Sequence, residues 1–186
     1  MSAWENAVIT TKGLLLQSKV AAGGAIQFTR VRTGTGKVDT SLLAKQTGVT
    51  GAKQEFSFAS NPMKKEGGEI QLYAVINNSG LTTGYNCYQL GLYATDPDDG
   101  EILYAIMQST SPLEVPSASA IADWSAEFII ALNFSNTENV TVVLDSAGYI
   151  TKTMAEAQYM KLVSYSDKMW QFGMDDEGIY LTDGIG

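Results

Sequence analysis

The sequence of 186 residues contains no histidine and one cysteine. Without histidine the chain cannot build a Ser-His-Asp triad, a histidine metal site or an imidazole acid–base pair. Cys87 has no partner for an intrachain disulfide and no imidazole to activate it as a nucleophile. It lies within a predicted strand, so we expect a small buried side chain. These absences argue against an enzyme, and no cofactor is expected.

Basic residues are also scarce, since 12 Lys and Arg face 20 Asp and Glu for a net charge of −8. Nucleic-acid binding needs clusters of Lys and Arg, and only Arg30/Arg32 and Lys64/Lys65 are close in sequence. We therefore expect no nucleic-acid partner. No apolar run approaches the roughly 20 residues that span a bilayer, and residues 1–20 do not resemble a signal peptide. The sequence predicts synthesis in the cytoplasm and no membrane insertion.

The stretch 88–107 predicts two strands joined by a turn. Before the turn, apolar Leu90, Leu92 and Ala94 alternate with other residues, which is typical of a half-buried strand. The segment 96–100 supplies the proline, aspartates and glycine of a turn. Even- and odd-numbered residues of 102–107 are all apolar, so both faces of this second strand are apolar and we expect it inside a sheet or between layers.

The remaining pattern predicts a mainly β protein of the α+β class. We expect a helix over 10–22, capped by Thr10 or Thr11, with an apolar or small face made of Leu14, Leu15, Ser18, Ala21 and Ala22. A short helix over 41–46 is expected to turn Leu42 and Leu43 inward. Further strands are predicted over 26–31, 53–60, 69–77, 121–134 and 140–144, with 121–134 the longest, a hairpin turn at 136–139 and an irregular loop over 109–120. This order favours an antiparallel β-sandwich or barrel with an N-terminal helix.

The C-terminal part is predicted as a separate segment, which divides the chain into 1–146 and 147–186. A capping box at Thr153 begins a helix over 153–165, and a β-hairpin follows over 168–182. Neither element is stable alone in water. The segment 147–186 therefore either docks on the first domain or associates with the same segment of other copies, and the residues leave both options open. The apolar side chains expected at this interface are Tyr159, Met160, Leu162, Val163, Trp170, Phe172, Ile179 and Leu181.

Trp4 is a further interface candidate. It is near enough to pack on a partner or to fold back on the helix over 10–22, and the second option is favoured because tryptophan is usually highly buried. Asp96, Asp98, Asp99 and Glu101 offer oxygen ligands for a cation, but the same residues serve a turn and do not match an EF-hand. We predict no metal site there. The tyrosines are expected in sheet faces, in an interface or as sugar-stacking platforms; they are Tyr85, Tyr88, Tyr93, Tyr149, Tyr159 and Tyr165.

Three stretches carry a resemblance to a known family. The central one reads Gly91-Leu92-Tyr93-Ala94, a Pro/Asp turn, and Glu101-Ile102-Leu103-Tyr104-Ala105. The opening one is Ile9 to Leu14, followed by Gln17, Lys19, Ala21 and Gly23. The third is Phe28 to Val31, followed by Gly34 and Gly36. Together these resemble the phage tail-collar fibre proteins, over residues 5 to 144.

The resemblance implies a structural virion protein of a contractile phage tail or phage-tail-like particle. Its N-terminal domain would attach to baseplate proteins and contribute to host attachment, and the chain would be a homotrimer. Family fibres continue into long shafts and tips, whereas this sequence stops at Gly186. We therefore expect a short fibre, or an adaptor that carries a further fibre or receptor-binding protein. The alternative is a carbohydrate-binding module that recognises a host surface glycan through tyrosine and tryptophan platforms.

Overall fold

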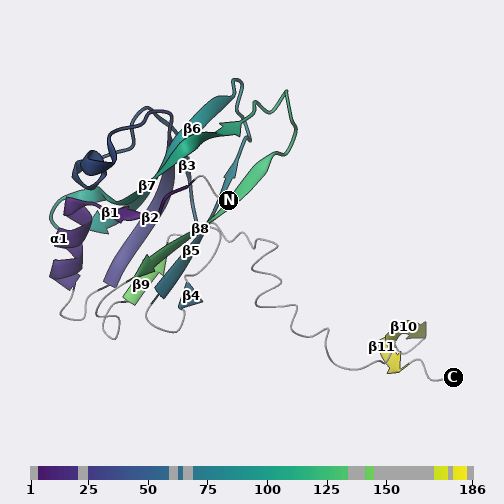
Figure 1. Ribbon diagram of the computed structural model, residues 1–186. Coiled ribbons are helices and arrows are strands. Elements are labelled where there is room, and N and C mark those ends of the chain that lie inside the picture. The colour runs from purple at the N-terminus through teal and green to yellow at the C-terminus, as the bar shows by residue number, and fades with distance from the viewer. Residues whose placement is uncertain are drawn as a thin grey trace. The chain divides into compact units, whose positions relative to one another are not determined.

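The computed structural model describes residues 4–20, 25–58, 63–64, 69–133, 141–144, 170–175 and 178–183. The chain divides into two compact units, Met1–Thr151 and Lys152–Gly186, which we describe separately. The described residues form mainly antiparallel β-sheets with one short α-helix (Figure 1), as the sequence predicts.

The first sheet is built around the β6–β7 hairpin. Its strand order is β1 (Val8–Ile9), β7 (Gly100–Val115), β6 (Tyr85–Asp96), β2 (Ala25–Gly34) and β3 (Ala52–Phe56), and β9 (Thr141–Leu144) pairs with β2. The predicted turn joins β6 to β7, and the Asp96 carboxylate accepts the backbone N–H groups of Asp98 at 2.9 Å and Asp99 at 3.2 Å. Gly100 has φ 75°, a conformation that glycine adopts without strain.

The second sheet contains β4 (Met63–Lys64), β5 (Glu69–Asn77) and β8 (Ser125–Asn133), in that order. The alternation predicted for β5 is confirmed, because Ile70, Leu72, Ala74 and Ile76 are all buried. They share one hydrophobic core with side chains of the first sheet. The ring of Phe28 on β2 lies at its centre, edge-on to Tyr104 at 5.0 Å and to Phe58 at 6.5 Å between centroids.

Strand β6 is buried on both faces, so the prediction of a half-buried strand is wrong. The cause is the segment 35–51, which covers the face of β6 and β7 that lies opposite the main core. Gln89 on β6 accepts the Thr50 N–H at 2.7 Å and donates to Gln108 on β7 at 2.8 Å. Gln108 in turn pairs with both backbone groups of Val38. Two buried glutamines thus fix this segment to the sheet.

The covering segment includes the 3₁₀ helix η1 (Thr40–Lys45), which Asp39 caps by accepting the Ser41 N–H at 2.9 Å. Leu43 is buried with Tyr93, Leu103 and Ile106. Leu42, in contrast, is 47% exposed. The prediction that both leucines face inward therefore holds only for Leu43, because consecutive side chains of a 3₁₀ helix point about 120° apart around its axis.

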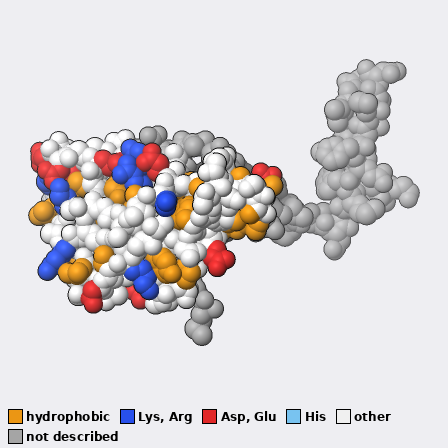
Figure 2. Space-filling view, turned by 90° about the horizontal axis from the view of Figure 1, so that it is seen from above, with side chains coloured by type: hydrophobic (Ala, Val, Ile, Leu, Met, Phe, Trp, Pro, Cys, Tyr) orange, Lys and Arg blue, Asp and Glu red, His pale blue; other side chains and the backbone are white. Residues whose placement is uncertain are grey.

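Helix α1 (Thr11–Val20) begins as predicted, since the Thr10 hydroxyl accepts the Gly13 N–H at 3.0 Å. Its buried residues, however, are Gly13, Leu16 and Val20. Leu14 and Leu15 are 53% and 58% exposed, so the predicted inward face is wrong. Glycine decides the orientation, because a Cβ at position 13 would overlap the carbonyl oxygen of Tyr104 on β7. Ala21 and Ala22 lie outside the described residues. Hydrophobic side chains appear as separate patches on the face shown in Figure 2.

Strand β7 is longer than predicted and contains 16 residues. It replaces the first part of the loop expected over 109–120, and it is longer than the strand at 121–134. The β6–β7 register passes from Gln89↔Gln108 to Cys87↔Leu113, so residues 109–112 bulge out of the ladder. Pro112 lies in this bulge, where no ladder N–H is required of it.

Strand β9 pairs with β2 in parallel, Ala25 opposite Thr141. The prediction that it returns as a hairpin from the strand at 121–134 is therefore wrong, and the proposed turn at 136–139 lies outside the described residues. Strand β9 belongs to the first sheet, whereas the strand at 121–134 belongs to the second, so among the described residues the two are not paired.

The second unit contains the predicted hairpin. Strands β10 (Trp170–Asp175) and β11 (Gly178–Asp183) pair antiparallel, with Phe172 opposite Leu181 and Met174 opposite Ile179. The predicted helix over 153–165, with Tyr159, Met160, Leu162 and Val163, lies outside the described residues.

Candidate functional site

The carboxylates of the central turn face the protein's own cations. Lys19 on α1 lies 2.7 Å from Asp96 and 2.8 Å from Asp98, and Lys12 lies 2.9 Å from Asp99. The hydrogen bond from Lys19 holds the pKa of the Asp96 carboxyl below its usual value, and the N–H groups of the turn act in the same direction. These contacts attach the first helix to the tip of the hairpin. Within the described part of the chain, no cluster of three or more acidic, cysteine or histidine side chains is arranged to hold a metal ion.

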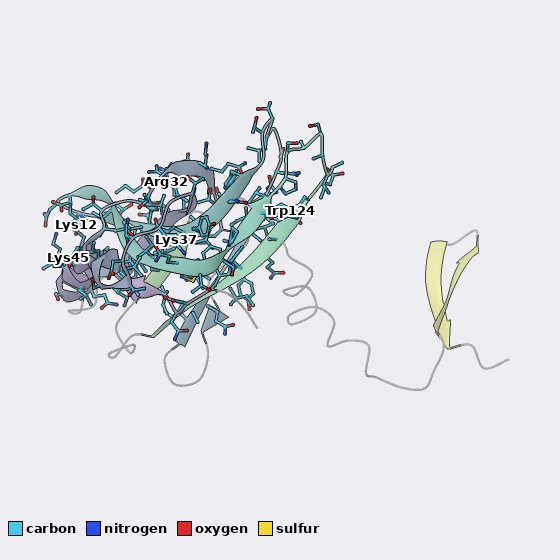
Figure 3. The ribbon with its side chains drawn as sticks, turned by 45° about the horizontal axis from the view of Figure 1, so that its top comes forward. Lys12, Arg32, Lys37, Lys45 and Trp124 are labelled. Carbon is cyan, nitrogen blue, oxygen red and sulfur yellow. The ribbon has the colours of Figure 1, made fainter. Side chains whose placement is uncertain are left out.

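The basic pair Arg30 and Arg32 is also paired with carboxylates. Both guanidinium groups contact Glu55, at 3.0 and 3.1 Å, and Glu101, at 2.7 and 3.3 Å. The two arginines lie on β2 between carboxylates of β3 and β7. Figure 3 shows Arg32 away from Lys12 and Lys45, which lie by the helices. This pairing neutralises the cations that a phosphate backbone would need.

Cys87 is fully buried, as predicted. Burial raises the pKa of its thiol to about 11, so the thiolate is scarce at neutral pH. Its Sγ donates to the Gln89 carbonyl at 3.3 Å. The side chain fills the core and is unsuited to act as a nucleophile.

The tyrosine side chains in the described residues differ in their burial and in their contacts. Tyr93 is buried under the segment 35–51, with the Arg32 guanidinium 4.8 Å from its ring centroid. The Tyr85 hydroxyl donates to Gln54 at 2.9 Å and lies 2.9 Å from the Thr33 hydroxyl. Burial raises the pKa of Tyr85 to about 12. Tyr88 lies beside Lys37, whose ammonium is 5.2 Å from the ring centroid. Tyr149, Tyr159 and Tyr165 lie outside the described residues.

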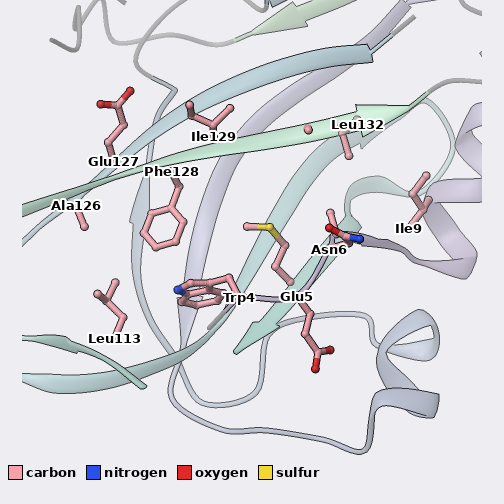
Figure 4. Close-up of a pocket in the computed structure, with 13 residues that line it drawn as sticks. Trp4, Glu5, Asn6, Ile9, Leu113, Ala126, Glu127, Phe128, Ile129 and Leu132 are labelled. Carbon is pink, nitrogen blue, oxygen red and sulfur yellow. The ribbon is translucent and has the colours of Figure 1, made fainter. Parts of the chain in front are cut away.

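The candidate functional site is a groove of about 800 Å³ between the N-terminal segment, β7 and β8 (Figure 4). We call it the Trp4 groove. Most of the residues that line it are apolar, although polar and apolar atoms contribute about equally to the exposed wall. The largest apolar side chains are Trp4, Ile9, Met107, Leu113, Phe128 and Leu132. Glu5, Asn6 and Glu127 supply its polar part.

Trp4 packs against other residues of its own unit. It forms a single antiparallel bridge with Ser109, and the neighbouring Glu5 N–H donates to the Gln108 carbonyl at 3.2 Å. The indole meets the ring of Phe128 on β8 edge-on, with 5.2 Å between centroids and an interplanar angle of 84°. Such aromatic pairs contribute beyond their buried area. Trp4 thus joins the N-terminal segment to β8 and stays partly exposed in the wall of the groove.

Strand β8 forms one side of the groove and the edge of the second sheet. Its even-numbered residues point to the core, whereas Glu127, Ile129 and Ala131 are exposed, Ile129 by 46%. Within the described ranges, β5 is the one strand that pairs with it, and their ladder has no bulge. An uninterrupted edge without proline or lysine is a template for another strand.

Sequence reasoning found Trp4 but missed the rest of the groove. Leu113 falls in the irregular loop predicted over 109–120, and Phe128 falls in the strand predicted over 121–134. The alternation of Leu113 and Val115 after Pro112 was the available signal for the extension of β7.

No helix in the described ranges is both long and apolar enough to cross a bilayer.

The chain has no match among protein-family models, curated proteins or solved structures. The resemblance to tail-collar fibre proteins therefore stays a prediction from the residues.

Proposed function

We propose that the protein is a structural virion protein, a tail fibre or fibre adaptor attached to the baseplate of a contractile phage tail or phage-tail-like particle. The observation that carries this proposal is the Trp4 groove. Its partly exposed aromatic and aliphatic walls lie beside the edge strand β8, a combination typical of surfaces that bind another protein chain. The protein then acts by burying apolar surface against its neighbours, without catalysis, and contributes in this way to host attachment.

The arrangement of the residues that carry the family resemblance supports this function. Gly91–Ala94 lie on β6, Glu101–Ala105 lie on β7, and the opening stretch leads into α1, which packs on β7. The third stretch, Phe28–Val31, lies on β2, which pairs with β6. The three stretches therefore occupy neighbouring elements of the first sheet and the helix packed on it. We further propose that the two sheets, which contribute to one core, pack as a β-sandwich.

The second unit is the basis for the proposed oligomer. Strands β10 and β11 form a sheet of two strands, and such a hairpin is only marginally stable in water. Association of this unit between copies, as a homotrimer, supplies the missing partner surface; an obligate interface of this kind commonly exceeds about 2,000 Å². Baseplate proteins at the Trp4 groove, and a further fibre or receptor-binding protein, are the other partners in this proposal.

The test is to locate the chain in the particle. The full chain carrying a small affinity tag is expressed in the bacterium that encodes it, and induced particles are purified and labelled with gold-conjugated antibody. We expect label at the baseplate end of the tail, and a trimer when the isolated chain is measured by light scattering.

Two matched variants test the groove. Ile129→Lys places a charge on an exposed groove residue, and Leu14→Lys does the same on α1, with similar exposure of 46% and 53%. Ile129→Lys should abolish incorporation into particles, whereas Leu14→Lys should leave incorporation unchanged. Particles without the chain, or equal incorporation of both variants, would contradict the proposal.

A further inference from the structure

A second pocket, of about 460 Å³, lies at the end of the β6–β7 hairpin opposite its turn. It is formed where β6 begins, where β7 ends and where the loop 116–124 leads into β8. The lining side chains that matter here are Tyr85, Asn86, Glu114, Ile121 and Trp124. Figure 3 shows Trp124 at the opposite end of the strands from Lys12. The volume is within the usual range for small-molecule sites.

The loop that carries Ile121 and Trp124 is held in place by a buried side chain. Asn78 is 1% exposed, and its amide donates to the carbonyls of Ile121 at 2.7 Å and Ser117 at 3.3 Å. The Asn78 backbone N–H donates to the Trp124 carbonyl at 3.3 Å. Both ends of the loop are therefore fixed from below, so that a ligand would not have to order it.

The backbone on both sides of the pocket is specialised. Asp123, next to Trp124, has φ 54°, and among the described non-glycine residues it is the one with a positive φ. Such outliers are concentrated at ligand sites. On the other side, a Cβ at Gly84 would lie 2.8 Å from the Val115 carbonyl oxygen. Glycine at this position allows the start of β6 to approach the end of β7 closely.

The side chains combine an apolar wall with a pair of polar groups. Trp124 is partly exposed and Ile121 is 52% exposed. Asn86 and Glu114 are directly opposite each other in the β6–β7 ladder, and both are exposed. The pocket thus offers an indole ring, an amide that donates and accepts, and a carboxylate that accepts two hydrogen bonds.

We propose that this pocket binds a neutral hexopyranose unit of a polysaccharide. A sugar ring has an apolar C–H face, which suits the indole of Trp124, and adjacent hydroxyls, which suit Asn86 and Glu114. The Glu114 carboxylate and the net charge of −8 disfavour uronic and sialic acids. This glycan recognition goes beyond the structural role, because it belongs to the chain itself and does not depend on attachment to a particle.

The experiment uses the full chain and four probes: methyl glucopyranoside, methyl galactopyranoside, N-acetylglucosamine and glucuronic acid. Saturation-transfer NMR detects binding, and titration of tryptophan fluorescence gives the affinity. We expect at least one neutral sugar to bind and glucuronic acid to fail. Trp124→Ala should lower the affinity at least about tenfold.

A second variant and a control guard against misfolding. Glu114→Gln changes an exposed side chain without loss of shape and should lower the affinity about tenfold, the size expected for a hydrogen bond to a charged group. Trp4→Phe alters the other groove and should leave the affinity unchanged. The proposal is overturned if no neutral sugar binds, or if binding survives both Trp124→Ala and Glu114→Gln. Either result leaves incorporation into particles unaffected, so the two proposals fail separately.

Discussion

Replacement of Gly13 by alanine tests how closely α1 approaches the first sheet. By helix propensity alone the change stabilises the helix by about 1 kcal/mol. The structure predicts the opposite sign, because the new Cβ would overlap the Tyr104 carbonyl oxygen and lie 2.9 Å from a methyl group of Ile9. Both neighbours belong to β1 and β7 and have little freedom to move.

The size of the destabilisation can be estimated from the contacts and hydrogen bonds that the helix loses. To restore van der Waals separation it has to retreat by about 1 Å. This stretches the hydrogen bond from the Thr10 N–H to the Tyr104 carbonyl, now 2.9 Å, and the hydrogen bonds from the Thr10 hydroxyl to the carbonyls of Leu103 and Tyr104. Overpacking costs about 1–3 kcal/mol, and each weakened hydrogen bond about 0.5–1.5 kcal/mol. If the weakening of these bonds amounts to the loss of one, and the propensity gain is subtracted, we expect a net loss of about 0.5–3.5 kcal/mol.

Urea unfolding at 25 °C, followed by far-ultraviolet circular dichroism and tryptophan fluorescence, measures this loss. Ser18→Ala is the matched control, because its exposed hydroxyl bonds only the Leu14 carbonyl, and it should be neutral or stabilising by up to about 0.5 kcal/mol. Leu16→Ala should cost about 2–5 kcal/mol, whereas Leu15→Ala should stay within about 0.5 kcal/mol. A Gly13→Ala protein as stable as Ser18→Ala would refute the close packing of α1 on β7.

Three further predictions concern other parts of the first domain. Gln89→Leu removes the partner of the Thr50 N–H, so it should cost about 1–3 kcal/mol and make the bond after Lys37 or Lys45 more sensitive to trypsin; an unchanged digestion pattern would argue that segment 35–51 is held otherwise. The lowered pKa of Asp96 gives stability that is complete above the unfolded pKa of about 4 and is lost as pH falls through the lower folded pKa; melting temperatures measured from neutral to acid pH should fall less steeply for Lys19→Met. Cys87 should not react with Ellman's reagent in the native protein, because its thiol is buried with a pKa near 11, and rapid reaction without urea would show that the core opens locally.

Local patterns predicted the elements whose signal is contained in their own residues. The β6–β7 hairpin, the strand at 69–77 and the hairpin at 168–182 each combine alternation with a turn sequence, and all three are present. The cap of α1 at Thr10 was predictable for the same reason. Such features need no knowledge of what lies next to them in space.

Errors arose where a distant segment decided the outcome. Leu14 and Leu15 are the larger hydrophobes of α1, yet the contact of Gly13 with β7 turns Leu16 inward instead. The burial of both faces of β6 depends on the segment 35–51, which is separated from β6 in the sequence by β3, β4 and β5. Pro112 indicated a loop because the bulge that accommodates it appears only in the register with β6.

The Trp4 groove was missed for a related reason. Its walls come from the N-terminal segment, β7 and β8, and no single stretch shows their meeting. The sequence pointed to Trp4 by residue type, whereas the pattern around Phe128 indicated only an alternating strand. The pocket near Trp124 depends on Asn78, whose role as a buried anchor has no local signature.

The docking of the first helix on β7 has a consequence for synthesis. Thr10 and the Tyr104 carbonyl that it binds are 94 residues apart in the chain. At typical rates of synthesis the ribosome needs about 5–20 s to produce that intervening length. During this interval the strand on which the nascent helix packs has not been synthesised, and Leu16 and Val20 remain accessible to chaperones or to neighbouring nascent chains. The helix therefore docks late in synthesis, when β7, the second strand of the central hairpin, has emerged.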